Sequence, residues 1–302
     1  MRFKNLDLNL LVALDHFLNE KSVSNAAKKM HITQSAASNA LSRLRDYFND
    51  EILIPSGKNM VLSSRATKMI QPVKQILMSI DNQIIQHPHL DPTQTQIHYT
   101  ICVSDYTLTT FIPVLLNEIR KKKYKISFDF LPQTVDPQKA LEHGEVDLLI
   151  IPLKYVLKKH PHRIVAKDHF VCISANNHPR LKQGNLTKEE FLEEQHIVMN
   201  PPYSNESYES LVMKELKIER KVALHSYSFT SLPYLVAHTE YLATVHSRLA
   251  NTHARSFELD IHELPFDFPD MEQAIQWHAY RKNDEELKFL IELITQCYQL
   301  TS

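Results

Sequence analysis

The 302-residue sequence has very little glycine: only Gly57, Gly144 and Gly184, which lie far apart. A phosphate-binding loop, a dinucleotide-binding fingerprint and a Gly-x-Ser-x-Gly nucleophile turn each need two or more glycines within a few residues. The sequence therefore excludes these common nucleotide-binding and hydrolytic motifs.

Cysteine is equally scarce, and Cys102, Cys172 and Cys297 form no Cys-x-x-Cys pair. Each lies within an apolar run, which indicates a buried thiol in a reducing compartment. We therefore interpret all three as core residues and not as redox switches.

Long hydrophobic runs are also missing. The most apolar segment, residues 146–153, contains an aspartate and a proline and is far shorter than the ~20 residues that span a bilayer. The apolar residues near the N-terminus are interrupted by Asp7, Asn9 and Asp15, and no small-residue cleavage site follows them. We expect a cytoplasmic protein that does not enter a membrane.

The charge is unevenly distributed along the chain. The net charge is −1, but residues 1–70 contain ten basic and six acidic side chains, a net charge of +4, which leaves −5 for the remainder. A basic first segment suits a part of the chain that meets phosphate groups. With 43% hydrophobic residues, the length suggests a small domain attached to a larger one.

Three helices are expected in the first 50 residues. Apolar residues recur at helical spacing over residues 7–20, and Ser22 or Ser24 can cap a short second helix that carries Ala26 and Ala27. Thr33 is an expected N-cap for a third helix over residues 34–48.

The third helix has two different faces. Its apolar residues gather on one side, whereas the other side carries short hydroxyl and amide side chains in place of the usual Glu and Lys. Such side chains can approach a groove floor, where Gln and Asn pair with adenine edges and Ser reaches bases or phosphates. The alternative is an ordinary solvated helix face. The candidate DNA-contacting residues are Thr33, Gln34, Ser35, Ser38, Asn39, Ser42 and Arg43.

Residues 51–62 are expected to form a β-hairpin with its turn at residues 56–59. A hairpin that directly follows a recognition helix is a wing. Lys58 at its tip is predicted to touch the DNA backbone or enter the minor groove.

Residues 7–66 resemble the DNA-binding segment of LysR-type transcriptional regulators, in particular the branch that contains the nodulation regulators. The matching residues are Asp7-Leu8-Asn9-Leu10-Leu11, Ala26-Ala27, Thr33-Gln34-Ser35-Ala36-x-Ser38, Arg43-Leu44-Arg45 and Tyr47-Phe48-Asn49-Asp50. The resemblance implies that Gln34, Ser35 and Ser38 begin the recognition helix and contact DNA. Ser35 stands where proline is usual and Pro55 where the wing usually has arginine, so we assign the wing contact to Lys58.

A long helix is expected to follow the wing, within a linker over residues 63–90. Ala66, Ile70, Val73, Leu77, Ile80 and Ile84 recur at steps of three and four residues, as in a coiled-coil seam. We expect this seam to pair two chains and Pro72 to bend the helix near Met69. The alternative is a helix packed on its own chain. A dimer presents two recognition helices to two half-sites, and the resemblance makes tetramers common as well.

The remainder of the chain, residues 95–302, alternates between strand and helix patterns, which predicts an α/β domain with a mainly parallel sheet. Strands are expected at residues 99–103, 126–131, 147–151, 170–174, 196–199, 222–225, 241–245 and 275–280, and helices at residues 108–121, 137–142 and 284–298.

The resemblance extends through this region. It rests on Leu141-x-x-Gly144-Glu145-x-Asp147-Leu148-x-Ile150, His178-Pro179 and Leu242-Ala243-x-Val245-x-x-Arg248-Leu249. His246 departs from the proline that is common there. The fold it implies is that of periplasmic binding proteins: lobe I over residues 95–168 and 271–302, lobe II over residues 169–270, and a ligand cleft between them.

Polar residues at predicted strand ends support such a cleft, because ligands of α/β sheets bind beyond the carboxyl ends of the strands. The helix after the first strand should also offer free N–H groups to an anion. The candidate effector-binding residues are Ser104, Thr107, Gln133, Thr134 and Pro152 from one lobe and His169, Tyr203, Tyr227 and Phe229 from the other. Their alternative roles are helix caps, turn residues and core aromatics. The expected effector is a small carboxylate-bearing or aromatic molecule.

The pairs His87-x-His89 and His160-x-His162 have metal-ligand spacing but lie in polar, proline-containing segments without a companion set of ligands. We therefore expect no metal and no cofactor. The fold class is an all-α winged helix-turn-helix (residues 1–62) and a linker helix, followed by a two-lobed α/β effector domain. This predicts a non-enzymatic, effector-controlled regulator that binds double-stranded DNA. The rival functions are an enzyme and a small-molecule-binding protein that uses the α/β cleft.

Overall fold

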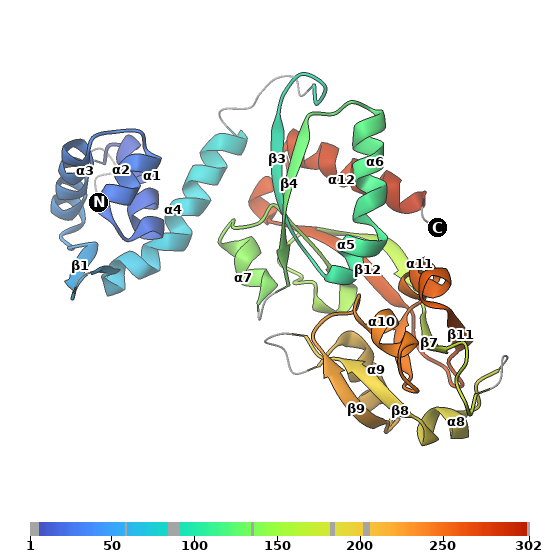
Figure 1. Cartoon of the computed structure of the whole chain (residues 1–302). Coiled ribbons are helices and arrows are strands. Elements are labelled where there is room, and N and C mark those ends of the chain that lie inside the picture. Colours follow the sequence, from blue (N-terminus) through green and yellow to red (C-terminus); the bar gives the residue numbers. More distant parts are fainter. Residues whose placement is uncertain are drawn as a thin grey trace. The chain divides into compact units, whose positions relative to one another are not determined.

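The computed structural model of the chain describes residues 6–57, 59–83, 91–133, 136–181, 185–201 and 206–300. The chain divides into two compact units (Figure 1): Met1–Pro88 with Glu142–Gly144, and His89–Leu141 with Glu145–Ser302. Within the described ranges, no helix is both long and apolar enough to cross a membrane.

The first unit consists of helices packed around one small core, together with a hairpin. Its elements are α1 (Asn9–Glu20), α2 (Val23–Lys29), α3 (Gln34–Phe48), β1 (Leu53–Ser56), β2 (Asn59–Leu62) and α4 (Ser64–Gln83). Leu14, Phe17 and Leu44 are completely buried at its centre. The predicted caps are confirmed, because Ser22 and Thr33 accept hydrogen bonds from the backbone N–H groups of Asn25 and Ala36.

The hairpin of β1 and β2 is antiparallel and is tied to the helices at both ends. The Arg45 guanidinium donates to the Leu53 carbonyl over 3.0 Å. The Asp50 carboxylate accepts from the Ile52 N–H (2.8 Å) and from the Ser63 hydroxyl. Ile52 is fully buried and has a φ of 60°, a conformation that β-branched residues rarely adopt. The hydrogen bonds to Asp50 and Arg45 hold this strained corner in place.

The helix α4 corrects one expectation about the predicted seam. Ala66 and Val73 are buried in the core of the first unit, and Ile70 and Leu77 pack against that core. The first half of the seam therefore packs on its own chain, as the alternative interpretation proposed, because this face of α4 covers α1. Ile84 lies outside the described residues, and pairing of two chains through α4 stays a prediction.

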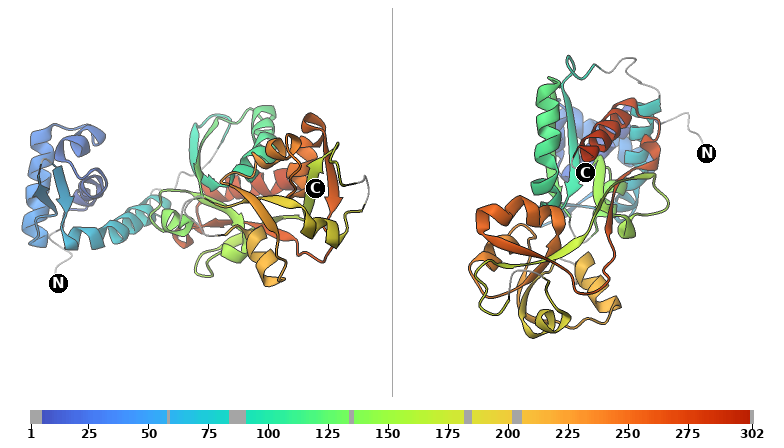
Figure 2. Two further views of the ribbon diagram at one scale, coloured as in Figure 1. Left: turned by 60° about the horizontal axis from the view of Figure 1, so that its bottom comes forward. Right: turned by 90° about the vertical axis from the view of Figure 1, so that its right-hand side faces the viewer.

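The second unit contains a five-stranded sheet in the order β4-β3-β5-β12-β6. Its strands are β3 (Ile97–Val103), β4 (Ile126–Pro132), β5 (Leu148–Pro152), β6 (His162–Asp168) and β12 (Met271–Trp277). The helices α6 (Ile112–Lys121) and α12 (Glu285–Gln299) cover one face (Figure 1 and Figure 2), and the short helix α7 (Pro137–Glu142) packs on the other. The buried residues of β3 alternate between these two faces, as the period of a strand requires.

The second lobe has a three-stranded antiparallel sheet in which β7 (Phe170–Ala175) lies between β10 (Ala243–His246) and β11 (Leu259–Glu263). The helices α10 (Leu232–Ala237) and α11 (Ser247–Phe257) pack on this sheet. Beside it lie the parallel pair β8 (Gln195–Met199) and β9 (Lys221–Ser226), with α8 (Lys188–Glu193) and α9 (Tyr208–Glu215). The expectation of a mainly parallel sheet is therefore wrong: β12 also runs antiparallel to both of its neighbours.

The chain crosses between the two sheets at two places. A single residue separates β6 from β7, and the chain returns through the segment between β11 and β12. The expected helix over residues 108–121 is two helices, α5 (Asp105–Thr110) and α6, because Pro113 lacks an N–H group and starts a new helix.

The three cysteines are buried and unpaired, as expected from their apolar surroundings. Burial raises the pKa of each thiol, because an ionised sulfur loses its hydration in an apolar environment. They are core residues and not reactive thiolates.

Candidate functional site

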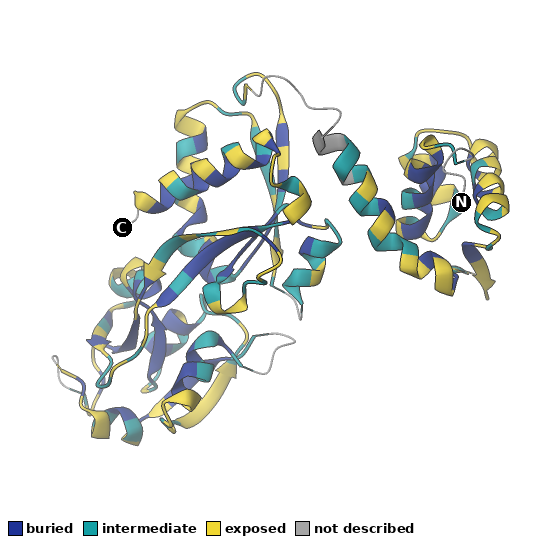
Figure 3. Cartoon of the chain, turned by 180° about the vertical axis from the view of Figure 1, so that it is seen from behind, coloured by how far each residue is buried: buried dark blue, intermediate teal, exposed yellow. Residues whose placement is uncertain are grey.

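The outward face of α3 is the first candidate site. Along the helices of the first unit, exposed residues alternate with buried ones (Figure 3), and Ala37, Leu41 and Leu44 are the buried positions of α3. The predicted contact residues are all exposed: Thr33, Gln34, Ser35, Ser38, Asn39, Ser42 and Arg43. The helix therefore presents a continuous surface of short polar side chains to solvent.

Two of these predicted contacts already have partners within the unit. The Thr33 hydroxyl caps α3 and lies 3.1 Å from the Ser35 hydroxyl. The Arg43 guanidinium donates to Asp7 over 2.9 Å, and this hydrogen bond lowers the pKa of the Asp7 carboxyl. Arg45, which the helix pattern placed on the polar face, binds backbone carbonyls of the wing instead.

The wing has its turn at the predicted place. Ser56 pairs with Asn59, and Gly57 between them has a φ of 62°, which glycine adopts without strain. Lys58 lies outside the described residues, so its predicted contact with DNA stays a prediction.

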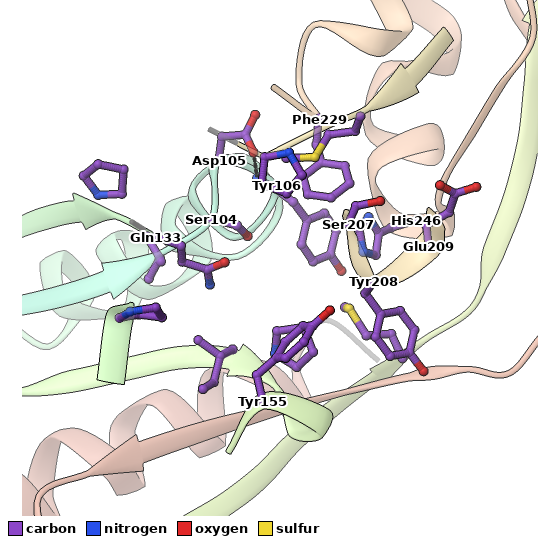
Figure 4. A pocket seen from close by; sticks show the side chains of 18 of the residues that line it. Ser104, Asp105, Tyr106, Gln133, Tyr155, Ser207, Tyr208, Glu209, Phe229 and His246 are labelled. Carbon is purple, nitrogen blue, oxygen red and sulfur yellow. Dashed lines mark hydrogen bonds between the residues drawn. The ribbon is translucent and has the colours of Figure 1, made fainter. Parts of the chain in front are cut away.

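The second candidate site is a cavity of about 630 Å³ between the two lobes of the second unit (Figure 4). Its volume is in the range of small-molecule sites. Lobe I contributes the ends of β3, β4 and β5 and part of β12, and lobe II contributes β7, α9 and the segments after β8, β9 and β10. The residues that line it include Ser104, Asp105, Tyr106, Gln133, Gln138, Pro152, Tyr155, Phe170, Met199, Ser207, Tyr208, Glu209, Tyr227, Phe229, His246, Met271 and Gln273.

The cavity brings together five of the predicted effector-binding residues: Ser104, Gln133, Pro152, Tyr227 and Phe229. Two others do not line it. Thr107 is completely buried behind Ser104, and His169 is exposed because Phe170, its neighbour in the extended chain, takes the inward position. Thr134 and Tyr203 lie outside the described residues.

The expected anion site at the start of α5 is already filled by the chain itself. The Ser104 hydroxyl caps this six-residue helix by accepting the N–H of Thr107 at 3.3 Å. The Thr107 hydroxyl in turn accepts from the Gln273 amide (2.8 Å), and the Gln273 oxygen accepts from the Tyr298 hydroxyl (3.1 Å). Thr107 therefore acts by fixing Ser104 and Gln273 in the cavity wall.

A carboxylate joins the two lobes beside the cavity. Asp105 of lobe I accepts from the Ser228 hydroxyl (2.8 Å) and from the backbone N–H and hydroxyl of Thr230 (3.0 and 3.2 Å) in lobe II. The Tyr106 hydroxyl donates to Asp168 at the end of β6. These contacts hold the start of α5 against both lobes.

The wall is mostly aromatic and aliphatic and, among the described residues, contains no lysine or arginine. Its acidic members are Asp105, Asp136, Glu206 and Glu209. Glu209 is buried and accepts two hydrogen bonds from Arg220, which is also nearly buried. The cavity therefore offers no cationic partner to an anionic ligand.

The aromatic wall residues Tyr106, Phe170, Tyr208 and His246 were not predicted. Tyr106 follows the same strand end as Ser104, and Phe170 adjoins His169, so both were within one or two residues of a predicted position. The signal at His246 was its departure from the proline of the resembling motif.

Comparisons with known proteins agree with this two-unit organisation. Residues 8–67 match the family described as "Bacterial regulatory helix-turn-helix protein, lysR family", and residues 93–298 match "LysR substrate binding domain". The chain belongs to the LysR family of transcriptional regulators. It is a LysR-type regulator with an N-terminal helix-turn-helix and a C-terminal effector-binding domain, so the predicted family, fold class and function are confirmed.

The relatives of this LysR-type regulator match it over nearly its whole length. Nodulation protein D 1 of Mesorhizobium japonicum is 33% identical over 297 residues, which cover 98% of this chain and 94% of the relative. Nodulation protein D 1 of Sinorhizobium fredii is 31% identical and covers 98% and 92%.

Solved structures share the fold of this LysR-type regulator. A full-length OxyR variant of Pseudomonas aeruginosa has a TM-score of 0.76 at 14% identity and covers 98% of this chain and 95% of its own. Full-length CbnR, solved in complex with its target DNA, has a TM-score of 0.62 at 11% identity and covers 98% and 100%.

Metal binding finds no support in the described parts of the chain, where no group of three or more His, Cys, Asp or Glu side chains could hold an ion. Of the two histidine pairs, His160 is buried and His162 is exposed, so the two side chains do not face one site. His87 and His89 lie outside the described residues.

Proposed function

We propose that this LysR-type regulator recognises double-stranded DNA through Gln34, Ser35, Ser38, Asn39 and Ser42 of α3, with Lys58 on the wing. The supporting observation is the exposed, uncharged polar face of α3. Short amides and hydroxyls leave room for close approach and can pair with base edges, which long charged side chains cannot do as closely. Thr33 caps the helix and Arg43 can exchange its exposed pairing with Asp7 for a phosphate.

We propose that two or four copies act together at the operator, in the cytoplasm, where the chromosome lies. One recognition helix reads only a few base pairs, and two copies related by a two-fold axis read two half-sites. The second half of α4, which continues beyond the core of the first unit, is the proposed pairing element.

We propose that the effector is an uncharged aromatic molecule and not a carboxylate. Three features of the cavity wall support this assignment: its aromatic lining, its acidic side chains and the lack of lysine or arginine among its described residues. A carboxylate would lose hydration on entering and would meet no cation there.

The cavity is proposed to bind its ligand without converting it. Both of its hydroxyl groups with nucleophilic potential are helix caps: Ser104 for α5 and Ser207 for α9. A serine–histidine pair does occur, Ser174 with His262 at 2.9 Å, but both residues are buried between β7 and β11 and neither lines the cavity. No substrate could reach that pair.

A gel-shift titration with the DNA upstream of the protein's own gene tests the central proposal. We expect a discrete complex that survives a scrambled competitor and weakens as salt increases, because phosphate contacts release counterions. The matched control is the same DNA with its sequence shuffled. If no complex formed at low salt, DNA recognition by α3 would be refuted.

A further inference from the structure

His246 occupies an unusual place in the cavity wall. It ends β10 in lobe II, and its ring is packed among three aromatic side chains. The ring centroids lie 3.9 Å from Tyr106, nearly parallel at 19°, and 4.6 Å from Phe170 and 5.0 Å from Phe229. In the view of Figure 4, His246 lies on the opposite side of the cavity from Gln133. This packing fixes the orientation of the imidazole.

One nitrogen of this fixed ring has no partner in the protein. His246 is 2% exposed, and its Nδ1 atom is buried without a hydrogen bond. A buried polar atom of this kind is destabilising unless another group satisfies it. Since the ring lines the cavity, the group that satisfies it can come from a ligand.

The ring is uncharged at neutral pH. Burial lowers the pKa of His246 to about 4, although Asp168 and Asp105 act in the opposite direction. A neutral imidazole has one N–H donor and one acceptor nitrogen. A hydroxyl group can pair with Nδ1 in either tautomer, because it can donate or accept.

The other polar groups of the wall are already engaged. Ser104 and Ser207 cap helices, the Gln133 amide donates to the Ile150 carbonyl, and Gln273 is bound at both ends. On the lobe I side the Gln138 amide oxygen is also without a partner, but this side chain is only half-buried and its nitrogen is held by Tyr155 and Gln276. Among the described wall residues, His246 is therefore the fully buried group that needs a ligand atom.

We propose that His246 is the residue by which the cavity distinguishes ligands, through a hydrogen bond between its Nδ1 atom and a hydroxyl group on an aromatic effector. The inference rests on the proposed function, in which the cavity holds an uncharged aromatic molecule. The aromatic wall supplies affinity for any planar ligand of suitable size, and Nδ1 rejects those that leave it unpaired. A site built around a buried polar group discriminates strongly against an analogue that lacks the matching group.

The test compares 2-naphthol with 2-methylnaphthalene, which has nearly the same shape but no hydroxyl group. Binding of each to the full chain is followed by ligand-observed NMR, with 2-naphthoate as a charged third probe. We expect the wild type to prefer 2-naphthol by roughly tenfold or more. The variant His246→Phe keeps the aromatic packing but removes both nitrogens, and it should lose this preference.

The variant His246→Asn serves as the rescue, because an amide atom takes nearly the position of Nδ1. It should retain part of the preference, which a merely structural role of His246 would not predict. His238→Phe, the same change outside the cavity wall, is the matched control and should behave as the wild type. Thermal unfolding of each variant establishes that it is folded.

The outcomes separate this inference from the proposed function. Equal binding of 2-naphthol and 2-methylnaphthalene by the wild type, or an unchanged preference in a folded His246→Phe variant, would overturn the role of His246 alone. Preferential binding of 2-naphthoate, or no binding of either uncharged probe, would instead refute the uncharged aromatic effector and with it this inference. Neither result bears on recognition of DNA by α3, which the gel shift measures separately.

Discussion

The polar face of α3 and the polar groups of the cavity are built on opposite principles. On α3, Gln34 and Ser38 are exposed to water and are free to rotate until a groove arrives. In the cavity, Ser104 and Gln273 are fixed by hydrogen bonds to Thr107 before any ligand enters. The first surface exchanges water for bases, and its specificity comes from many small contacts. The second is preorganised, so its selectivity depends on the few atoms still available.

Filling the cavity should have the largest effect. A Ser104→Trp variant places an indole in the wall and should abolish binding of 2-naphthol, measured by ligand-observed NMR, while operator affinity in a gel shift is unchanged. Because Ser104 also caps α5, the change should cost about 1 kcal/mol of stability in addition. Ser104→Ala is the control, since it removes the cap but not the space. Undiminished probe binding by the tryptophan variant would move the ligand site elsewhere.

Acid should destabilise the effector domain through its buried histidines. Burial lowers the pKa of both His196 and His246 to about 4, from an ordinary value of 6.5. Between these values the unfolded chain binds protons that the folded chain does not, so stability falls as the pH decreases from about 6.5 towards 4. Each histidine should cost about 2 kcal/mol between pH 7 and pH 5.

Urea unfolding at pH 7 and pH 5 measures this loss. The lower limit of pH 5 stays above the range in which the Glu194 carboxyl titrates, whose pKa is lowered by Arg180. His246→Phe removes one of the two groups and should reduce the pH dependence, whereas His238→Phe should not. A pH-independent free energy of unfolding would contradict the burial of these rings in the uncharged form.

The smallest effect is expected on α3, where each contact is one of many. Gln34→Ala or Ser38→Ala should weaken operator binding by roughly tenfold, because each removes one base or phosphate contact. Thermal unfolding should be unchanged, since both residues are exposed. Asn19→Ala, an exposed change on α1, is the matched control for the gel shift. Operator affinity and sequence preference equal to the wild type in both α3 variants would place the recognition face elsewhere.

The sequence predicted the first unit in detail because its signals are local. The third helix, its Thr33 cap and its two faces all follow from one stretch of 16 residues with a helical period. In the second unit, β6 was missed because it is an edge strand whose His162, Arg163 and Lys167 give it a polar composition. Polar edge strands protect sheets from association but weaken the strand pattern.

The cavity was predicted only in part, for a different reason. Ser104, Gln133 and Pro152 could be inferred because ligands lie beyond the carboxyl ends of strands. His246 and Phe170 meet Tyr106 only after two lobes have folded against each other, and no local pattern records that contact. His169 and Phe170 differ by one position, but consecutive residues of an extended chain point to opposite sides, so the neighbouring choice was the correct one for the wall.

Asp105 bears on how fast such a regulator can respond. Its carboxylate joins the lobes through Ser228 and Thr230, groups of the chain itself. An effector therefore need not wait for a slow domain closure, and its observed association rate should rise in simple proportion to its concentration. The onset of a signal would follow the arrival of the molecule, and the persistence of the signal would be set by how long that molecule stays.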